Sequence, residues 1–114
     1  MIKNSIVLVP FPFDNFSTSK VRPSLCLTSA IGKHKHVIIA FISSKIPDEP
    51  IESDFLIKKN SVNCIGTGLA VDSVIRLHKI VTIPQNLIKR KLGMINADVE
   101  KIITKKIHQL FEYE

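Results

Sequence analysis

The stretch Asp72-Ser73-Val74-Ile75-Arg76-Leu77-His78-Lys79-Ile80-Val81-Thr82-Ile83 decides the fold class of this chain, because its side chains alternate over its whole length. Alternation with a period of two is typical of a β-strand, in which successive side chains point to opposite faces of the sheet. One predicted face carries Val74, Arg76, His78, Ile80 and Thr82, and the other carries Ile75, Leu77, Lys79, Val81 and Ile83. The pattern therefore predicts a long strand with Arg76 and His78 on the same face.

Shorter runs rich in apolar and β-branched residues predict further strands on both sides of this one. The expected strands cover residues 6–9, 25–28, 36–42, 55–57 and 94–95. The first ends where Pro10 and Pro12 remove backbone donors that a continuing central strand needs. The nearly unbroken apolar run of residues 36–42 predicts a strand that is buried on both faces.

The last part of the chain changes to helical spacing. Asn96 is a good N-cap, and Val99, Ile103, Ile107 and Leu110 recur on one side, which predicts an amphipathic helix over residues 97–111. Residues 87–92 predict a helical turn or short helix with a glycine stop at residue 93. Strands followed by one long helix, without βαβ alternation, predict a single mainly β domain over residues 1–114. We expect a small β-barrel or strongly bent sheet with the helix packed against it.

The composition is that of a folded, basic protein. Of 114 residues, 45% are hydrophobic, and 16 Lys plus Arg against 10 Asp plus Glu give a formal net charge of +6. This hydrophobicity excludes a disordered polyelectrolyte. The longest aliphatic or aromatic run, residues 37–42, is far shorter than the ~20 residues of a transmembrane helix, so no membrane association is expected. The positive charge favours nucleic acid or an acidic protein chain as partner.

The cysteines and histidines give no pattern of a disulfide framework or a metal site. Cys26 and Cys64 form no CxxC or zinc-ligand motif, so the cytoplasm is the expected compartment and no metal or other cofactor is predicted. Cys26 lies in an apolar strand and is interpreted as a buried thiol rather than a nucleophile. His34 and His36 fit an exposed basic turn better than a metal site. Gly66-Thr67-Gly68 fits a turn that needs a permissive backbone better than a phosphate-binding loop.

Two arginines stand out from the general positive charge. Arg22 lies where a loop of turn-forming residues meets a strand, and Pro23 restricts its backbone to extended conformations. A planar guanidinium in that position matches two phosphate oxygens. Arg76 is two residues from His78, and such a pair can stabilise a charged transition state and move a proton near neutral pH. By spacing alone, these side chains also fit ordinary solvent-facing positions.

Several weak signals occur in one familiar order along the chain. They are IVLVPFPF at residues 6–13, SKVRPSL at 19–25, ISS at 42–44, GL at 68–69, DSVIRL at 72–77, TI at 82–83 and KLG at 91–93. In this order the chain closely resembles the MazF/PemK toxin family, from Ile6 to the final helix. The segment around Arg22-Pro23 and the DSVIRL segment are the most specific parts of the match.

The resemblance implies the toxin component of a type II toxin-antitoxin system. It implies an SH3-like barrel with a C-terminal helix, the fold of MazF and CcdB toxins, assembled as a homodimer. The implied activity is sequence-specific, ribosome-independent and metal-independent cleavage of single-stranded RNA, which inhibits translation and growth. The ribose 2′-hydroxyl attacks its own phosphodiester and leaves a 2′,3′-cyclic phosphate. The implied protein partner is an antitoxin whose acidic, disordered tail folds over the basic groove and which forms a DNA-binding complex with the toxin.

The resemblance also implies site residues. Arg22 matches the family's principal acid/base and phosphate-stabilising arginine, and Ser43 stands where the family commonly has a threonine. Arg76 and His78 match an arginine and an aspartate that some branches use. Residues 13–21 correspond to the family's mobile loop over the RNA groove. The implied RNA-binding residues are Asp14, Asn15, Ser19, Lys20, Ser44, Lys45 and Lys79.

Three departures from the family pattern keep other functions open. The usual glycine-aspartate before the first strand is Asn4-Ser5, an arginine before the TI pair is Val81, and the aspartate is His78. The last two departures suit a catalytically silent module that binds RNA or antitoxin. A gyrase-poisoning toxin of the same fold is a further alternative, disfavoured because that class commonly ends in a tryptophan and this chain has none.

Overall fold

The fold was analysed in a computed structural model, which describes residues 2–10 and 21–112. The elements in chain order are β1 (Ser5–Pro10), β2 (Val21–Cys26), β3 (His36–Ser43), β4 (Asp54–Ile57), the short 3-10 helix η1 (Val62–Cys64), β5 (Ser73–Pro84), the 3-10 helix η2 (Gln85–Leu87), β6 (Arg90–Met94) and the α-helix α1 (Ala97–Phe111). No helix in the described ranges is long and apolar enough to cross a membrane.

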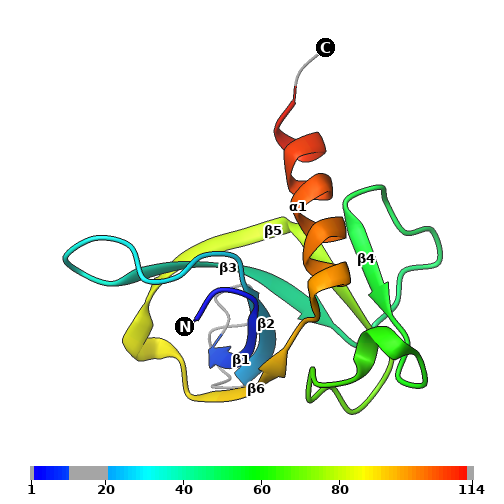
Figure 1. The fold of residues 1–114 in the computed structure, drawn as a ribbon, viewed down its shortest axis with the longest axis horizontal. Helices are drawn as coiled ribbons and strands as arrows, with labels where there is room; N and C mark the ends of the chain where they lie inside the picture. The colour runs from blue at the N-terminus through cyan, green and yellow to red at the C-terminus, as the bar shows by residue number, and fades with distance from the viewer. Residues whose placement is uncertain (1, 11–20, 113–114) are drawn as a thin grey trace.

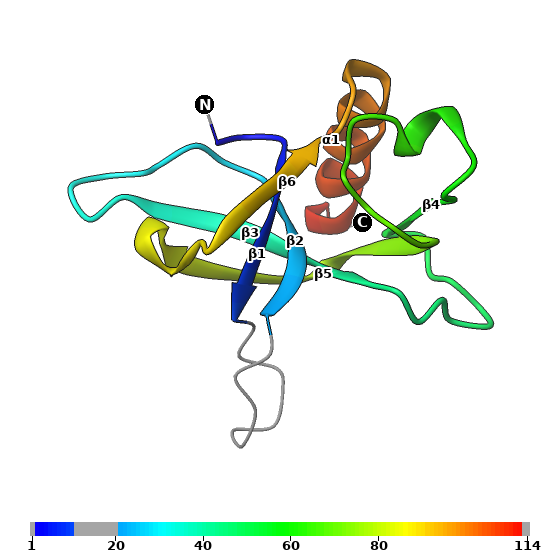
Figure 2. The ribbon, with the colours of Figure 1, turned by 90° about the horizontal axis from the view of Figure 1, so that it is seen from below.

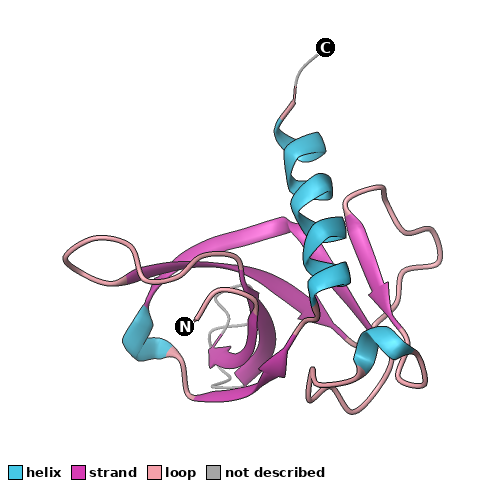
Figure 3. Ribbon diagram, in the orientation of Figure 1, coloured by secondary structure: helices cyan, strands magenta, loops and turns pink. Residues whose placement is uncertain are grey.

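The strands form one antiparallel sheet that curls into a half-barrel. The sheet has six strands in the order β4-β5-β3-β2-β1-β6 (Figures 1 and 2). The helix α1 follows β6 and stands beside β4 and β5, as the colouring by secondary structure makes clear (Figure 3). The predicted mainly β fold with a C-terminal helix is confirmed, and the helix has the predicted bounds.

Strand β5 contains an irregularity that the sequence pattern does not reveal. The consecutive residues Ala40 and Phe41 of β3 pair with Ile80 and Arg76, so residues 77–79 bulge out of the ladder. A bulge changes the phase of alternation along the strand. The predicted grouping of side chains into two continuous faces was therefore wrong: Leu77 and Ile80 contribute to one apolar cluster, whereas Val81 and Ile83, beyond the bulge, contribute to another.

Three other predictions of strand position needed correction. β2 begins at Val21 rather than at residue 25, because β1 pairs with Val21, Arg22 and Pro23. Proline is tolerated there because β3 pairs with β2 only from Ser24 onward. Residues 87–92 do not form a helical turn, since η2 ends at Leu87 and β6 then pairs with the edge of β1. Gly93 lies within β6 and does not end a helical turn. The strand predicted over residues 94–95 is absent as a separate element of the described structure, because Met94 is the last residue of β6.

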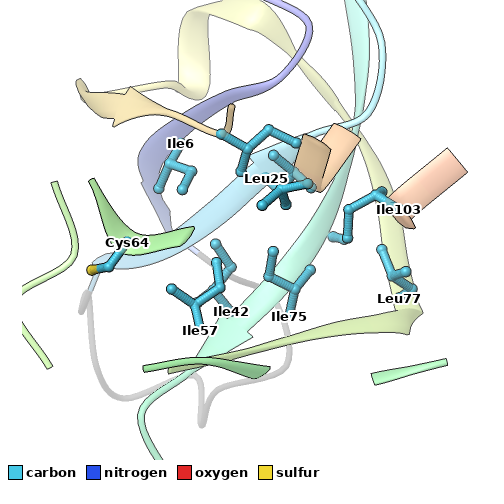
Figure 4. Packing of buried hydrophobic residues seen from close by; sticks show 11 residues of the cluster. Ile6, Leu25, Ile42, Ile57, Cys64, Ile75, Leu77 and Ile103 are labelled. Atoms are coloured by element: carbon cyan, nitrogen blue, oxygen red, sulfur yellow. The ribbon is translucent and has the colours of Figure 1, made fainter. Parts of the chain in front are cut away.

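Apolar side chains cover both faces of the curled sheet. One cluster joins buried residues of the sheet to Val99 and Ile103 of α1 (Figure 4). Its other members are Ile6, Leu25, Ala40, Ile42, Ile57, Cys64, Ile75, Leu77 and Ile95. The other cluster contains Val7, Val9, Cys26, Val37, Ile39 and Ile83. The run in β3 supplies both clusters, as its apolar composition predicts. At its N-terminus α1 is capped by Asn96, whose Oδ1 accepts the Val99 N–H at 2.8 Å.

Candidate functional site

A groove of about 360 Å³ lies where β2 begins and β3 ends. Its lining combines polar and apolar residues. The groove is lined by Arg22, Pro23, Ile42, Ser43, Ser44, Gly68, Leu69, Ala70, Val71, Ser73 and Leu92. It therefore brings together Arg22, Ser43 and Ser44, which were named from the sequence as catalytic or RNA-binding candidates.

Arg22 and Ser43 lie just beyond the paired parts of their strands. The last pair between β2 and β3 is Ser24 with Phe41, and Arg22 and Ser43 each lie two residues farther along, where both line the groove. The Oγ of Ser43 accepts the backbone N–H of Lys45 at 3.0 Å. A hydroxyl that accepts in this way keeps its own proton for donation, so it suits an anionic phosphate oxygen.

The opposite wall of the groove depends on the predicted Gly66-Thr67-Gly68 turn. Gly66 and Gly68 have φ of +83° and +77°, a region that favours glycine, so the interpretation as a permissive turn is confirmed. A Cβ at Gly68 would collide with the carbonyl oxygen of Leu92. Between the glycines, the buried Thr67 donates its Oγ1 proton to the Cys64 carbonyl at 2.7 Å and accepts the Leu69 N–H at 3.2 Å. The Met94 N–H of β6 donates to the Gly66 carbonyl at 2.8 Å, which holds this wall against β6.

A second polar cluster lies farther along β5 and is held together by a residue that the sequence did not identify. The Nε of Arg76 donates to Oδ1 of Asp54 at 2.8 Å, and Nδ1 of His78 lies 4.0 Å from the same oxygen. The side chain of Asp54 is 1% exposed, whereas that of Arg76 is 20% exposed. Asp54 is the first residue of β4 and directly precedes the strand that was predicted over residues 55–57. In the sequence it is marked only as an acidic residue next to an apolar run.

His78 lies in the bulge of β5 and favours the neutral form. Its pKa is lowered from the ordinary value of 6.5, first by partial burial and then by the positive charge of Arg76, against the opposing effect of Asp54. At neutral pH the carboxylate of Asp54 is therefore paired with Arg76 and not with an imidazolium. A neutral imidazole can accept a proton, which a guanidinium cannot do in this pH range.

Ser43 of the groove and Arg76 of the second cluster occupy neighbouring positions on one face of the sheet. Ser43 is opposite Val74, and Phe41 is opposite Arg76, so Ser43 and Arg76 are diagonal neighbours on adjacent strands. The intervening pair Ile42 and Ile75 points to the opposite face, into the core (Figure 4). Diagonal neighbours on paired strands are about 7–8 Å apart, within reach of a long side chain.

The other predicted RNA-binding residues have different outcomes. Ser44 lines the groove, and Lys45 is an exposed residue that immediately follows it. Lys79 is exposed, and its Nζ lies 5.8 Å from the centre of the Phe41 ring. Phe41 of β3 is in turn opposite Arg76 of β5. The predicted residues Asp14, Asn15, Ser19 and Lys20 lie outside the described residues.

The remaining nucleophile and metal candidates take no part in these clusters. Cys26 is fully buried, and burial raises the pKa of its thiol to about 11, so it is protonated at neutral pH. His34 and His36 are exposed, with ring centres 6.0 Å apart. Within residues 2–10 and 21–112, no group of three or more His, Cys, Asp or Glu side chains is placed to hold a metal ion.

Comparison with known proteins links this arrangement to one family. The model of the family of PemK-like, MazF-like toxins of type II toxin-antitoxin systems matches residues 3–111. No curated protein matches the sequence. The fold is similar to that of the Mycobacterium tuberculosis toxin MazF-mt6, with a TM-score of 0.72 and 20% identity, over 96% of this chain and 98% of that chain.

A second similar structure is a mycobacterial endoribonuclease in complex with its cognate antitoxin. Its TM-score is 0.70 and its identity 9%, over 100% of this chain and 99% of that chain. A further Mycobacterium tuberculosis toxin has a TM-score of 0.67 and 19% identity, over 93% of this chain and 99% of that chain. At these identities the structures establish the shared fold.

Proposed function

Because the chain belongs to the family of PemK-like, MazF-like toxins of type II toxin-antitoxin systems, we propose that it is an endoribonuclease. Its substrate is single-stranded RNA, and cleavage needs no metal ion or other cofactor. The groove lined by both Arg22 and Ser43 carries this proposal, because it brings a cation and a hydroxyl donor to one surface on which a phosphate can bind. The similar fold of a mycobacterial endoribonuclease supports it.

In the proposed reaction the ribose 2′-oxygen attacks the adjacent phosphorus and the bond from phosphorus to the 5′-oxygen breaks. The products are a 2′,3′-cyclic phosphate and a 5′-hydroxyl. Arg22 stabilises the additional negative charge on the phosphoryl oxygens, and Ser43 donates a hydrogen bond to one of them. Neutral His78 accepts the 2′-hydroxyl proton, and Arg76 binds phosphate next to it. The leaving 5′-oxygen takes a proton from solvent water, and protonated His78 returns its proton to solvent after cleavage.

The proposed partners follow from the same family and from charge. An antitoxin with an acidic tail suits a chain with a net charge of +6, and a similar structure contains a cognate antitoxin. A homodimer in the cytoplasm is proposed as the working form of the toxin. A mass of about 26 kDa in sedimentation equilibrium, twice the 12.8 kDa of one chain, would support the dimer.

The decisive experiment is RNA cleavage by purified protein in the presence of EDTA. A long RNA is incubated with the native protein, with Arg22→Ala, and with Arg90→Ala, which removes an exposed arginine of β6 as a matched control. We expect 2′,3′-cyclic phosphate ends from the native protein and from Arg90→Ala, and a loss of at least ~10²-fold in Arg22→Ala. No cleavage by the native protein, or equal cleavage by both arginine variants, would contradict the proposal.

A second candidate function is a catalytically silent module that binds RNA or antitoxin. It is favoured by His78 and Val81, which stand where family members have aspartate and arginine. Such a module would bind single-stranded RNA with an affinity that falls steeply as salt rises, and would leave the RNA intact. Binding measured by fluorescence anisotropy, beside the cleavage assay, separates the two functions.

A further inference from the structure

Asp54 is a buried carboxylate for which the proposed reaction has no role so far. Its Oδ2 accepts the backbone N–H of Ile51 at 3.0 Å, and its own N–H donates to the Ile51 carbonyl at 2.9 Å. These reciprocal bonds close a turn at the start of β4 and fix the orientation of the carboxylate. The other oxygen, Oδ1, is directed at β5 and bonds to Arg76.

The bond from Asp54 leaves the phosphate-binding part of Arg76 unused. Within the described residues the side chain of Arg76 has one hydrogen bond, from Nε to Asp54, so both of its Nη groups remain as donors. Arg76 is also directly opposite Asp54 on β4 and Phe41 on β3. A guanidinium held at Nε keeps a planar pair of amino groups that matches two phosphate oxygens.

We propose that Asp54 is a positioning residue for RNA cleavage, which holds Arg76 in place to bind a phosphate of the RNA beside His78. This inference rests on the proposed endoribonuclease function and deepens it. Asp54 is almost completely buried and does not contact the RNA. It acts through Arg76, because a charged pair with one buried partner restricts the guanidinium to a narrow range of positions.

The charge of Asp54 also acts on His78, which gives a second readout. His78 faces the positive groups Arg76 and Lys79 on its own strand and Asp54 on β4, and Asp54 opposes the lowering of its pKa. Removal of the carboxylate charge therefore lowers the His78 pKa further. A residue that only stabilised the turn at Ile51 would leave this pKa and the arginine unchanged.

The test compares Asp54→Asn, Arg76→Ala and the double variant in the RNA cleavage assay, with Asp98→Asn as control. Asp98→Asn removes the same charge from the exposed first turn of α1. We expect Asp54→Asn to lower kcat by about 10²-fold, the scale for a misplaced catalytic group, and to cause no further loss when Arg76 is already alanine. Full activity of Asp54→Asn, or an equal loss in the Arg76→Ala background, would overturn the proposal.

An NMR titration of the His78 ring, carried out on the same proteins without RNA, separates this inference from the proposed function. The midpoint is expected to shift to lower pH in Asp54→Asn and to stay in place in Asp98→Asn. An unchanged midpoint in Asp54→Asn would overturn the role of Asp54 even if the native protein cleaves RNA. If the native protein does not cleave RNA, the proposed function fails, and the proposed role of Asp54 in RNA cleavage fails with it.

If Asp54→Asn does not fold, Asp54→Glu replaces it in the kinetic comparison. This variant keeps the charge and displaces the carboxylate by one methylene.

Discussion

Arg22 and Arg76 lie on the same face of the sheet in different surroundings. Arg22 is half-buried at the start of β2, where Pro23 restricts its backbone and β1 pairs with it. Arg76 lies on β5 and forms a 2.8 Å bond to Asp54, whose side chain is 1% exposed. Loss of Arg76 therefore leaves a buried carboxylate without its charged partner, and we expect the two arginines to differ in their contribution to stability.

The largest effect is expected where the backbone itself builds the groove wall. Gly68→Ala adds a Cβ that collides with the Leu92 carbonyl at a φ of +77°, whereas Gly32→Ala has a φ of +72° and open space around the added carbon. Both variants incur backbone strain, and only Gly68→Ala incurs the collision. We expect the free energy of unfolding to fall by about 4 kcal/mol for Gly68→Ala and about 1 kcal/mol for Gly32→Ala. Urea denaturation measures both, and equal losses would contradict this account of the wall.

The next effect distinguishes the two arginines directly. Arg76→Ala leaves the buried carboxylate of Asp54 without its charged partner, so the free energy of unfolding should fall by about 3 kcal/mol. Arg22→Ala should lower it by less, about 1 kcal/mol, because it leaves the ion pair of the buried Asp54 intact. Urea denaturation of both variants at pH 7 gives the comparison. An equal loss of stability would mean that Arg22 is held by side-chain contacts of similar strength.

The same contrast explains which parts of the site could be predicted from the sequence. Arg22 is next to a proline, and Gly66-Thr67-Gly68 is a glycine pair, so local backbone chemistry marks both in the sequence. Asp54 is 22 residues from Arg76, and their contact depends on the register between β4 and β5. No local pattern encodes that register. The candidate residues that a local signal marks were named from the sequence, and Asp54, whose contact depends on a long-range pairing, was not.

The fold shows the same division between local and long-range information. The helix α1 has its predicted bounds because its cap and apolar spacing are local features. The alternation of polar and apolar residues breaks at His78 and Lys79, inside the bulge of β5, but the bulge was not predicted because this break does not show how the pairing with β3 shifts. Strand β6 was not predicted because residues 87–92 favour a helical turn on their own. Residues 90–94 form a strand because they pair with the edge of β1. Tertiary pairing overrode a weak local preference there.

A smaller effect is expected at the Ser43 hydroxyl, which lines the groove together with Arg22. Ser43→Ala removes one neutral hydrogen-bond donor from the groove and should lower RNA cleavage about tenfold, equivalent to about 1.4 kcal/mol. Ser43→Thr keeps the hydroxyl and should retain most of the activity. Ser61→Ala, which removes a hydroxyl bonded to the Lys58 carbonyl on the surface, is the control. If Ser43→Thr were as impaired as Ser43→Ala, the hydroxyl would not be the group that matters at this position.

The smallest effect concerns the proton on His78. Its pKa in the folded protein lies below the ordinary value of 6.5, so between these two values the unfolded chain binds more protons than the folded one. The free energy of unfolding should therefore fall as the pH is lowered through 6.5, until it reaches the folded pKa, and then stop falling on account of this group. His78→Gln lacks this contribution, so its stability should decline less over the same interval. Urea denaturation at closely spaced pH values measures the difference. A steeper decline in His78→Gln than in the native protein would mean that Asp54 outweighs Arg76 and burial, and that the imidazole is charged where the proposed reaction needs it neutral.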